Sequence, residues 1–367
     1  MTKELLREET KNAKELFHGD KVLRAGKKEV KEVIDFSTNT NPYGPPPELL
    51  RKIGENLEKI STYPPHQPRN IRKKIAEHCD STPEKIVLGN GCNELIYLIA
   101  RSFLSKEDET VTVEPTYTEY SKAAKLQGST PKAIRLREEE SFELEMEDLK
   151  GISEETKLVF LCSPNNPTGN LHKEKVLEGA AEICEEKKSL LVLDESFIEF
   201  TGREREYGPI HGGSENVIVL RSLTKFYSIP GLRVGYAVAP KPIAQSLRKA
   251  QPQWNVNGLS LLAAGEAVKS SKYRGKTRAK IRKNGTFLSE SLSRLGVNTY
   301  PWDANFLLSD FSSLNTDAQN IAKKLLEKGI GVRMCDDFKF LDKNYIRMSF
   351  RPKKECEKLI ESLKEIL

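Results

Sequence analysis

The sequence predicts an α/β protein with a large domain, built on a mostly parallel sheet flanked by helices, and a smaller α+β domain. Up to about residue 250, short apolar runs rich in Val, Ile and Leu alternate with amphipathic stretches of helical length. This alternation is typical of a parallel sheet covered on both faces. Beyond that point, a long helical stretch precedes short strands and helices. We therefore expect an N-terminal arm with part of the small domain over 1–40, the large domain over 41–250 and the small domain over 251–367.

Six apolar runs are predicted to be strands of the large domain, at residues 85–89, 110–114, 157–163, 189–194, 216–221 and 234–239. Helical patterns lie between several of them, over 93–104, 117–127 and 173–187. The small domain is expected to contain helices over 256–295, 317–328 and 353–367, and strands over 304–308, 331–334 and 345–350. Ligands of open α/β sheets bind beyond the carboxyl ends of the strands, so the functional site is expected there.

The composition fits a small anionic molecule as a partner at least as well as nucleic acid, and it argues against several other classes of protein. The 367 residues carry a formal charge of +6, without a Lys/Arg block, so nucleic acid is not an expected partner. No apolar run reaches the roughly 18–20 residues of a membrane span, and the charged N-terminus does not resemble a secretory signal. The six cysteines form no CxxC pair and no His lies at metal-ligand spacing. We therefore expect neither a metal site nor disulfides, and a reducing cytoplasm as the compartment.

A turn after the first predicted strand carries the pattern of an anion site. Gly89, Asn90 and Gly91 precede Cys92 and Asn93, where the next helix is expected to begin. Glycines permit a tight turn, and the start of a helix offers free N–H groups and the positive end of the helix dipole. Phosphate binding and an ordinary strand–helix turn are both compatible with this pattern.

A proline-rich loop follows the third predicted strand. Residues 163–169 read SPNNPTG, and two prolines beside an Asn pair form a rigid loop that aims an amide side chain at a fixed point. A turn without a binding role is the alternative. Asn166 is the residue of this loop that we expect to point at a ligand.

The next predicted strand ends at a carboxylate, and the strand after it is followed by an amine. Asp194 closes the run LLVLD, where a buried carboxylate needs a partner, although a helix cap is the commoner role of such an aspartate. Lys225 follows Ser222 and Thr224 and precedes Phe226, an apolar setting suited to Schiff-base chemistry. A solvated surface lysine is the alternative.

Together, these four features fit pyridoxal 5'-phosphate. The anion cup would hold the phosphate of this cofactor, the carboxylate would keep its pyridine nitrogen protonated, and the amine would form the covalent link. Each feature is moderate evidence alone, and their order along successive strand ends makes the combination specific.

Further motifs make the chain resemble the fold-type I, aspartate-aminotransferase-like superfamily of pyridoxal-phosphate enzymes, over about residues 35–350. The motifs are DFS at 35–37, NPYG at 41–44, YP at 63–64, GNG at 89–91, EPTY at 114–117, PNNPTG at 164–169 and GLR at 231–233. The resemblance implies the aspartate-aminotransferase-like fold, pyridoxal 5'-phosphate as cofactor and a large cofactor-binding domain. It also implies a homodimer with shared active sites.

The resemblance assigns a role to each candidate residue. Lys225 should bind the cofactor covalently, Asp194 should pair with its pyridinium nitrogen, Asn166 should bond the ring hydroxyl and Tyr117 should stack on the ring. The residues expected around the phosphate are Gly91, Cys92, Asn93, Ser222, Thr224 and Arg233. Tyr63 should reach the cofactor phosphate of the neighbouring subunit.

Two branches of the superfamily compete, the histidinol-phosphate aminotransferases and the L-threonine-O-3-phosphate decarboxylases of cobalamin biosynthesis. Phe197 occupies the position at which aminotransferases usually carry a tyrosine, as in the decarboxylases. The segments 221–231 (RSLTKFYSIPG) and 253–257 (QWNVN) also resemble the decarboxylase branch. So does His18-Gly19, although Asp20 stands where that branch has glycine.

We therefore expect decarboxylation of L-threonine O-3-phosphate to (R)-1-amino-2-propanol O-2-phosphate and CO2. Arg347 is expected to grip the substrate carboxylate with Asn41 or Asn166 nearby, and Arg333 is expected to bind the substrate phosphate with His18. The nearest alternative is a histidinol-phosphate aminotransferase that transfers an amino group to 2-oxoglutarate. Serine phosphate as substrate, and a non-catalytic protein that keeps this fold, are further alternatives.

Overall fold

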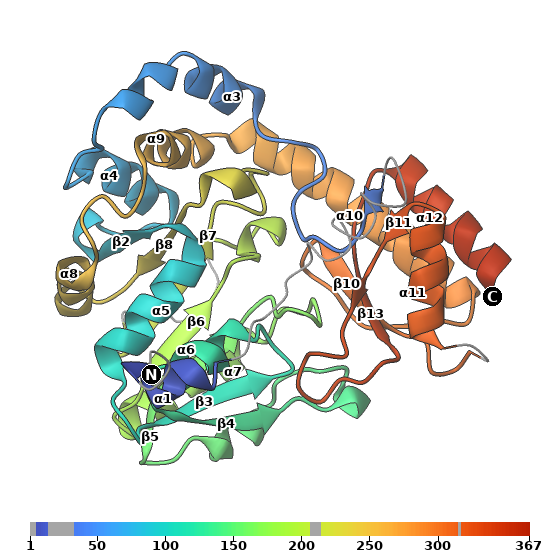
Figure 1. The fold of residues 1–367 in the computed structure, drawn as a ribbon, viewed down its shortest axis with the longest axis horizontal. Coiled ribbons are helices and arrows are strands. Elements are labelled where there is room, and N and C mark those ends of the chain that lie inside the picture. Colours follow the sequence, from blue (N-terminus) through green and yellow to red (C-terminus); the bar gives the residue numbers. More distant parts are fainter. Residues whose placement is uncertain (1–4, 14–32, 206–213, 315–316) are drawn as a thin grey trace.

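The large domain is built on a seven-stranded mixed sheet (Figure 1). The computed structural model describes residues 5–13, 33–205, 214–314 and 317–367. The strands in spatial order are β2 (Ile86–Gly89), β8 (Gly235–Val238), β7 (Val217–Ser222), β6 (Leu190–Asp194), β5 (Thr156–Cys162), β3 (Glu109–Glu114) and β4 (Thr130–Arg135). Only β8 runs against its neighbours, since β8 pairs antiparallel with both β2 and β7, whereas the other adjacent pairs are parallel. The predicted α/β class is confirmed.

The burial of the strands explains which of them the sequence revealed. The six predicted strands match β2, β3, β5, β6, β7 and β8 to within one residue at each end, and all of their residues except Lys157 are buried. The strand β4 was not predicted. It lies at the edge of the sheet and most of its residues are at least partly exposed, so it has no continuous apolar run.

Helices cover both faces of this sheet. They are α3 (Pro47–Gly54), α4 (Arg69–His78), α5 (Gly91–Phe103), α6 (Glu119–Lys125), α7 (Glu174–Glu186), α8 (Lys241–Ala250) and α9 (Gly258–Ala267). Side chains of α5, α6 and α8 share one apolar core with one face of the sheet. Those of α7 pack on the opposite face, where α4 and α9 cover the end formed by β2 and β8.

The predicted helical stretch 256–295 is two helices. Of these, α9 lies against α3 and α4, and α10 (Ser271–Arg294) runs from there to the small domain (Figure 1). The small domain adds α11 (Ala318–Glu327), α12 (Lys353–Ile366) and an antiparallel sheet. Its strands in spatial order are β12 (Arg333–Met334), β13 (Tyr345–Ser349), β10 (Phe306–Asp310) and β9 (Asn298–Thr299).

The N-terminal part of the chain contacts both domains. The strand β1 (Ile34–Asp35) pairs in parallel with β11 (Ile330–Gly331) beside the small domain. The short helix α1 (Glu8–Lys11) lies by the large domain, where the Arg7 guanidinium donates to the Leu126 carbonyl at 3.3 Å. After β1, residues 37–40 cross between the domains and line the central pocket.

Candidate active site

A cavity of about 830 Å³ lies between the two domains, at the carboxyl ends of the parallel strands. The segment 37–40, the large domain and the small domain all contribute to its lining. The residues from the two domains are Cys92, Asn93, Ile96, Tyr117, Thr118, Tyr120, Cys162, Asn166, Asp194, Ser196, Phe197, Thr224, Lys225, Pro230, Arg233, Arg333, Phe338 and Arg347. The strand ends are therefore the place at which the candidate residues gather, as the sequence predicted.

Asp194 ends β6 and is buried, with both carboxylate oxygens positioned by the protein. One oxygen accepts a hydrogen bond from the Tyr120 hydroxyl at 2.8 Å and the other accepts one from the Ser196 backbone N–H at 2.8 Å. Burial and the charge of Asp194 raise the pKa of Tyr120 well above its ordinary value, so this hydroxyl remains a donor. The carboxylate is thus fixed in orientation and keeps free lone pairs for a further donor.

Sequence reasoning missed Tyr120, although a signal for it existed. Tyr120 stands three residues after Tyr117, a spacing that places side chains close together in a helical turn. The two rings meet edge to face at 5.6 Å, and Tyr120 stacks on Phe160 at 5.1 Å. Tyr117 therefore rests on a buried aromatic support, with its own ring lining the cavity.

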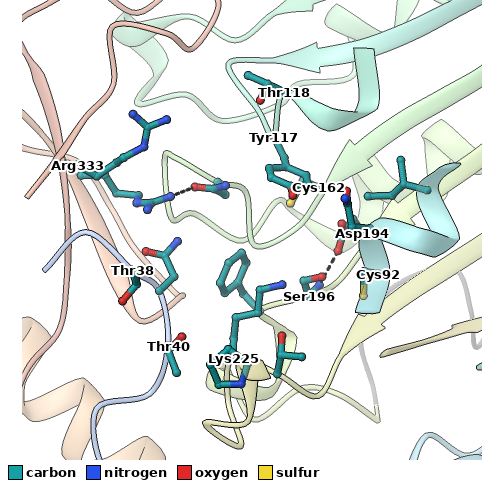
Figure 2. Close-up of a pocket in the computed structure, with 18 of the residues that line it drawn as sticks. Thr38, Thr40, Cys92, Tyr117, Thr118, Cys162, Asp194, Ser196, Lys225 and Arg333 are labelled. Carbon is teal, nitrogen blue, oxygen red and sulfur yellow. Dashed lines mark hydrogen bonds between the residues drawn. The ribbon is translucent and has the colours of Figure 1, made fainter. Parts of the chain in front are cut away.

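Lys225 lies just beyond β7, and its amine enters the same space as Asp194 and Tyr117 (Figure 2). The Lys225 Nζ donates to the Ser222 hydroxyl at 3.3 Å and lies 5.8 Å from the centre of the Phe197 ring. The hydroxyls of Ser222 and Thr224 are 2.8 Å apart. The turn after β7 thus presents an amine beside two hydroxyl groups.

The start of α5, where the sequence predicts an anion cup, lies close to a cation. Gly91 has a φ of +79°, and a Cβ atom at this position would lie 2.7 Å from the Nη2 of Arg233. The absence of a side chain therefore lets the Arg233 guanidinium approach the first turn of the helix. Cys92 and Asn93 line the cavity beside it. Burial, and then the charge of Asp194, raises the pKa of the Cys92 thiol to about 11, so Cys92 is a neutral group here.

Arg347 on β13 is buried, and it forms no ion pair with a carboxylate of the described residues. Its Nη1 donates to the Asn166 side-chain oxygen and its Nη2 donates to the Ser37 carbonyl at 2.6 Å. Within the described part of the chain, its buried Nε has no hydrogen-bond partner. Burial lowers the pKa of Arg347 to about 10, so the guanidinium is still charged at neutral pH. A carboxylate is the group that this cation lacks.

Arg333 on β12 lies opposite Arg347 in the register of the small sheet. The Nη2 of Arg333 contacts both carboxylate oxygens of Asp337, at 2.7 and 2.9 Å, and its Nη1 donates to the Met334 carbonyl at 2.5 Å. The guanidinium also lies over the ring of Phe338. Asp337 is about half exposed, so an anion in the cavity would compete with a solvated carboxylate for Arg333.

Asn41 does not lie where we expected a substrate-binding residue. Its amide is buried outside the cavity lining and donates to the Phe226 carbonyl at 2.9 Å and the Tyr273 hydroxyl at 2.7 Å. Asn39, two residues earlier, lines the cavity, and its buried side-chain oxygen has no partner in the described part of the chain. Of the two asparagines in the run NTNP, Asn39 therefore lines the cavity, whereas Asn41, the predicted one, bonds segments of the protein to each other.

Two candidates remain, His18 and Tyr63. His18 lies outside the described residues. The Tyr63 ring is 79% exposed and stacks on Trp254 with the ring centres 4.4 Å apart. Tyr63 is not among the residues that line the cavity of its own chain.

These residues fit pyridoxal 5'-phosphate. The cradle over Gly91, with Arg233, Ser222 and Thr224, would hold the phosphate, because it combines a helix N-terminus with a cation and hydroxyl donors. Asp194 would face the ring nitrogen, Tyr117 would cover the ring, Asn166 would bond the ring hydroxyl and Lys225 would bind covalently. In the described residues, no group of three His, Cys, Asp or Glu side chains could hold a metal ion, and no helix is long and apolar enough to cross a membrane.

This chain is similar to known enzymes over most of its length. A family model described as aminotransferase class I and II matches residues 31–363. A histidinol-phosphate aminotransferase of Methanocaldococcus jannaschii is 30% identical over 95% of this chain and 93% of its own. A threonine-phosphate decarboxylase of Salmonella typhimurium is 33% identical over 92% of each chain. Several more relatives carry the first of these two names.

Solved structures share the fold. The crystal structure of a histidinol-phosphate aminotransferase from Sinorhizobium meliloti, in complex with pyridoxal-5'-phosphate, superposes with a TM-score of 0.86 and 22% identity. The match covers 99% of this chain and 98% of that one.

Proposed function

Because this chain belongs to the aminotransferase class I and II family, we propose that it is a pyridoxal 5'-phosphate enzyme that decarboxylates L-threonine O-3-phosphate. The products would be (R)-1-amino-2-propanol O-2-phosphate and CO2, and the reaction would serve cobalamin biosynthesis. The 33% identity to a threonine-phosphate decarboxylase supports this choice.

Phe197 is the observation that carries the proposal. It lies in the cavity near the Lys225 amine, three residues after Asp194, and its ring packs edge to face on Phe306 at 5.0 Å. The resemblance places a tyrosine here in aminotransferases, with its hydroxyl on the ring oxygen of the cofactor. A phenylalanine offers no donor, so Asn166 would be left as the side chain that bonds this oxygen.

The small domain contributes two arginines to the cavity lining, Arg333 and Arg347, and the proposed substrate has two anionic groups. Arg347 and Arg333 lie opposite each other on adjacent strands, and both line the cavity. Threonine phosphate presents a carboxylate and a phosphate together. We assign the carboxylate to Arg347, whose buried guanidinium has no ion-pair partner in the described chain, and the phosphate to Arg333.

The roles of the remaining residues follow from their positions. The bound cofactor supplies a conjugated ring that withdraws electrons from the substrate α-carbon. Asp194, held by Tyr120, keeps a negative charge facing the ring nitrogen. Arg347 and Arg333 fix the substrate by its two anionic groups and so determine which bond at the α-carbon is broken. The Lys225 amine is the group placed to deliver a proton to that carbon.

A homodimer with shared active sites is part of this proposal. Tyr63 is exposed and held by Trp254, so its hydroxyl is available to a neighbouring subunit. Other large apolar side chains are exposed on nearby parts of the chain, namely Leu50, Leu57 and Ile60. Exposed apolar groups of this kind are typical of a protein interface.

Product analysis with threonine phosphate as the sole substrate tests the function. The expected result is release of CO2 and the aminopropanol phosphate by the holoenzyme, with no keto acid added. Turnover that depends on 2-oxoglutarate, with histidinol phosphate as amino donor, would instead support the second candidate. That candidate, a histidinol-phosphate aminotransferase, is favoured by the number of relatives with this name. Parallel assays with serine phosphate measure the contribution of the substrate methyl group.

A further inference from the structure

A second large cavity lies at the edge of the large domain and is lined by residues of α4, of α8 and of the turn before β2. Figure 1 shows these two helices beside that end of the sheet. This groove of about 870 Å³ shares no lining residue with the cavity between the domains. Its charged lining residues are Arg69, Arg72, Lys73, Arg248, Lys249 and Glu84, with His66 beside them. Five cations thus face one carboxylate, and the proposed reaction uses none of them.

Arg72 is the unusual member of this set. Its side chain is buried, with the residue only 8% exposed, and yet it lines the groove and a small adjoining cavity next to Leu88. Within the described residues, its buried Nε has no hydrogen-bond partner, and Arg72 forms no ion pair. A buried charge is costly unless it is paired, so this guanidinium lacks an anion.

The neighbours of Arg72 increase the free-energy cost of burying its charge. Burial lowers the pKa of Arg72, and the charge of Arg69 lowers it further. Arg248 donates from one nitrogen to the carbonyls of Glu84 and Ile86, at 2.8 and 3.1 Å. Burial and the charge of Arg72 lower the pKa of Arg248 as well. The two guanidinium groups of this groove therefore repel each other. The Glu84 carboxylate partly offsets this effect on both pKa values, but within the described residues it forms an ion pair with neither group.

The N-terminus of helix α4 adds the positive end of its helix dipole to the groove. Its N-cap is Pro68, whose side chain makes no capping hydrogen bond, and its first turn contains no acidic residue. Cations near the N-terminus of a helix oppose the helix dipole, whereas an anion is stabilised there. Arg69 begins this helix, and Arg72 and Lys73 follow within its first turns.

We propose that this groove binds a small phosphate-bearing anion, held by Arg72 and Arg248 at the N-terminus of α4. A bound phosphate would supply the counter-charge that the buried guanidinium lacks and would accept hydrogen bonds from it. The volume exceeds the needs of inorganic phosphate, so a phosphate monoester with a small organic part also fits. This site is separate from the cofactor cup and from Arg333, and it does not depend on the proposed reaction.

The test measures phosphate binding to the holoenzyme, by calorimetry and by the melting temperature, at constant ionic strength set with chloride. The Arg333→Gln background removes the expected phosphate contact in the active site. In that background, Arg72→Met should melt at or above the parent temperature without phosphate, because an unpaired buried charge is gone. Its affinity for phosphate should fall about tenfold or more, since a charge-assisted hydrogen bond is lost.

Two further variants keep the test decisive. Arg69→Gln/Lys73→Gln changes exposed side chains, so it should fold normally and still weaken phosphate binding. Arg294→Gln removes an exposed cation from α10, outside the groove, and should bind as the parent does. Glycerol phosphate, compared with inorganic phosphate, distinguishes a monoester site from a site for the free ion, and either result supports the proposal.

Two results would overturn it. One is unchanged phosphate binding in both groove variants, which would assign the observed binding to other sites. The other is dissociation of a dimer by Arg69→Gln/Lys73→Gln with no effect of phosphate. In that case, carboxylates of a second subunit would be the anions that the groove receives.

Discussion

The Tyr120 hydroxyl donates a 2.8 Å hydrogen bond to Asp194, from a ring that is itself clamped between Tyr117 and Phe160. One aromatic cluster therefore supports both Tyr117, which would cover the cofactor ring, and the Asp194 carboxylate, which would pair with the ring nitrogen. Tyr120 lines the cavity, and its hydroxyl also holds the Asp194 carboxylate in place. We therefore regard Tyr120 as a positioning residue for the carboxylate at the end of β6.

Replacing Tyr120 with phenylalanine should weaken catalysis while the cofactor stays bound. A hydrogen bond to a charged group contributes about 1.5–3 kcal/mol, so kcat should fall about tenfold or more. The pH profile of kcat should be measured as well, because Asp194 loses one of the two donors that fix its orientation. Steady-state kinetics and the cofactor's absorbance measure these effects.

Tyr236→Phe is the matched control for this experiment. Tyr236 is also fully buried, but its hydroxyl has no partner in the described chain. Its removal should leave kcat and the pH profile unchanged. An equal loss in both variants would show that burial of a tyrosine, rather than the bond to Asp194, produces the effect.

Replacing Phe197 with tyrosine tests the residue on which the proposed function rests. The new hydroxyl should bond the ring oxygen of the cofactor and alter its proton affinity. We expect CO2 release from threonine phosphate to fall about tenfold, in line with the energy of one hydrogen bond, while amino transfer to a keto acid rises. The ratio of the two products is the measurement. Phe197→Leu removes the ring without adding a hydroxyl; a similar change of ratio there would contradict the assignment.

The central sheet could be predicted because its strands are buried on both faces and read as continuous apolar runs. The edge strand β4 has exposed positions and no such signal. The positions of Asp194, Asn166 and Lys225 at one edge of the sheet were also predictable, since each ends one of these runs or follows it within a few residues.

Residues whose role depends on packing between distant segments were not predictable. Asn39 and Asn41 are equivalent in the sequence, and only their contacts show that Asn41 bonds Phe226 and Tyr273 while Asn39 faces the cavity. Similarly, the sequence around Arg72 does not distinguish it from the other charged residues of a polar helix. Its burial beside Arg248 results from the approach of α8, which is far away in the sequence.

The buried ion pair of Glu195 and Arg221 should stabilise the turns that carry Asp194 and Ser222. Both side chains are almost fully buried, the Nε–Oε2 distance is 2.7 Å, and Arg221 also donates to the Glu204 carbonyl at 2.6 Å. Removing one partner leaves an unpaired buried charge, so Glu195→Leu or Arg221→Met should each cost about 3–5 kcal/mol. The double variant should be markedly more stable than the sum of the singles predicts. Urea unfolding of the holoenzyme measures this; additive losses would mean that the two charges act independently.

His172 should make the protein less stable in mild acid. The residue is buried, its Nδ1 accepts a hydrogen bond from the Leu144 N–H, and burial lowers its pKa from 6.5 to about 4. Between these values the unfolded chain binds a proton that the folded protein does not, so the stability conferred by neutral His172 is present above pH 6.5. It is lost as the pH falls to 4, by about 3 kcal/mol in total. Urea midpoints measured from pH 7 to pH 4 should therefore decline more steeply in the parent than in His172→Gln. His66→Gln, at an exposed histidine, should keep the parental slope, and identical slopes for the parent and His172→Gln would refute the assignment.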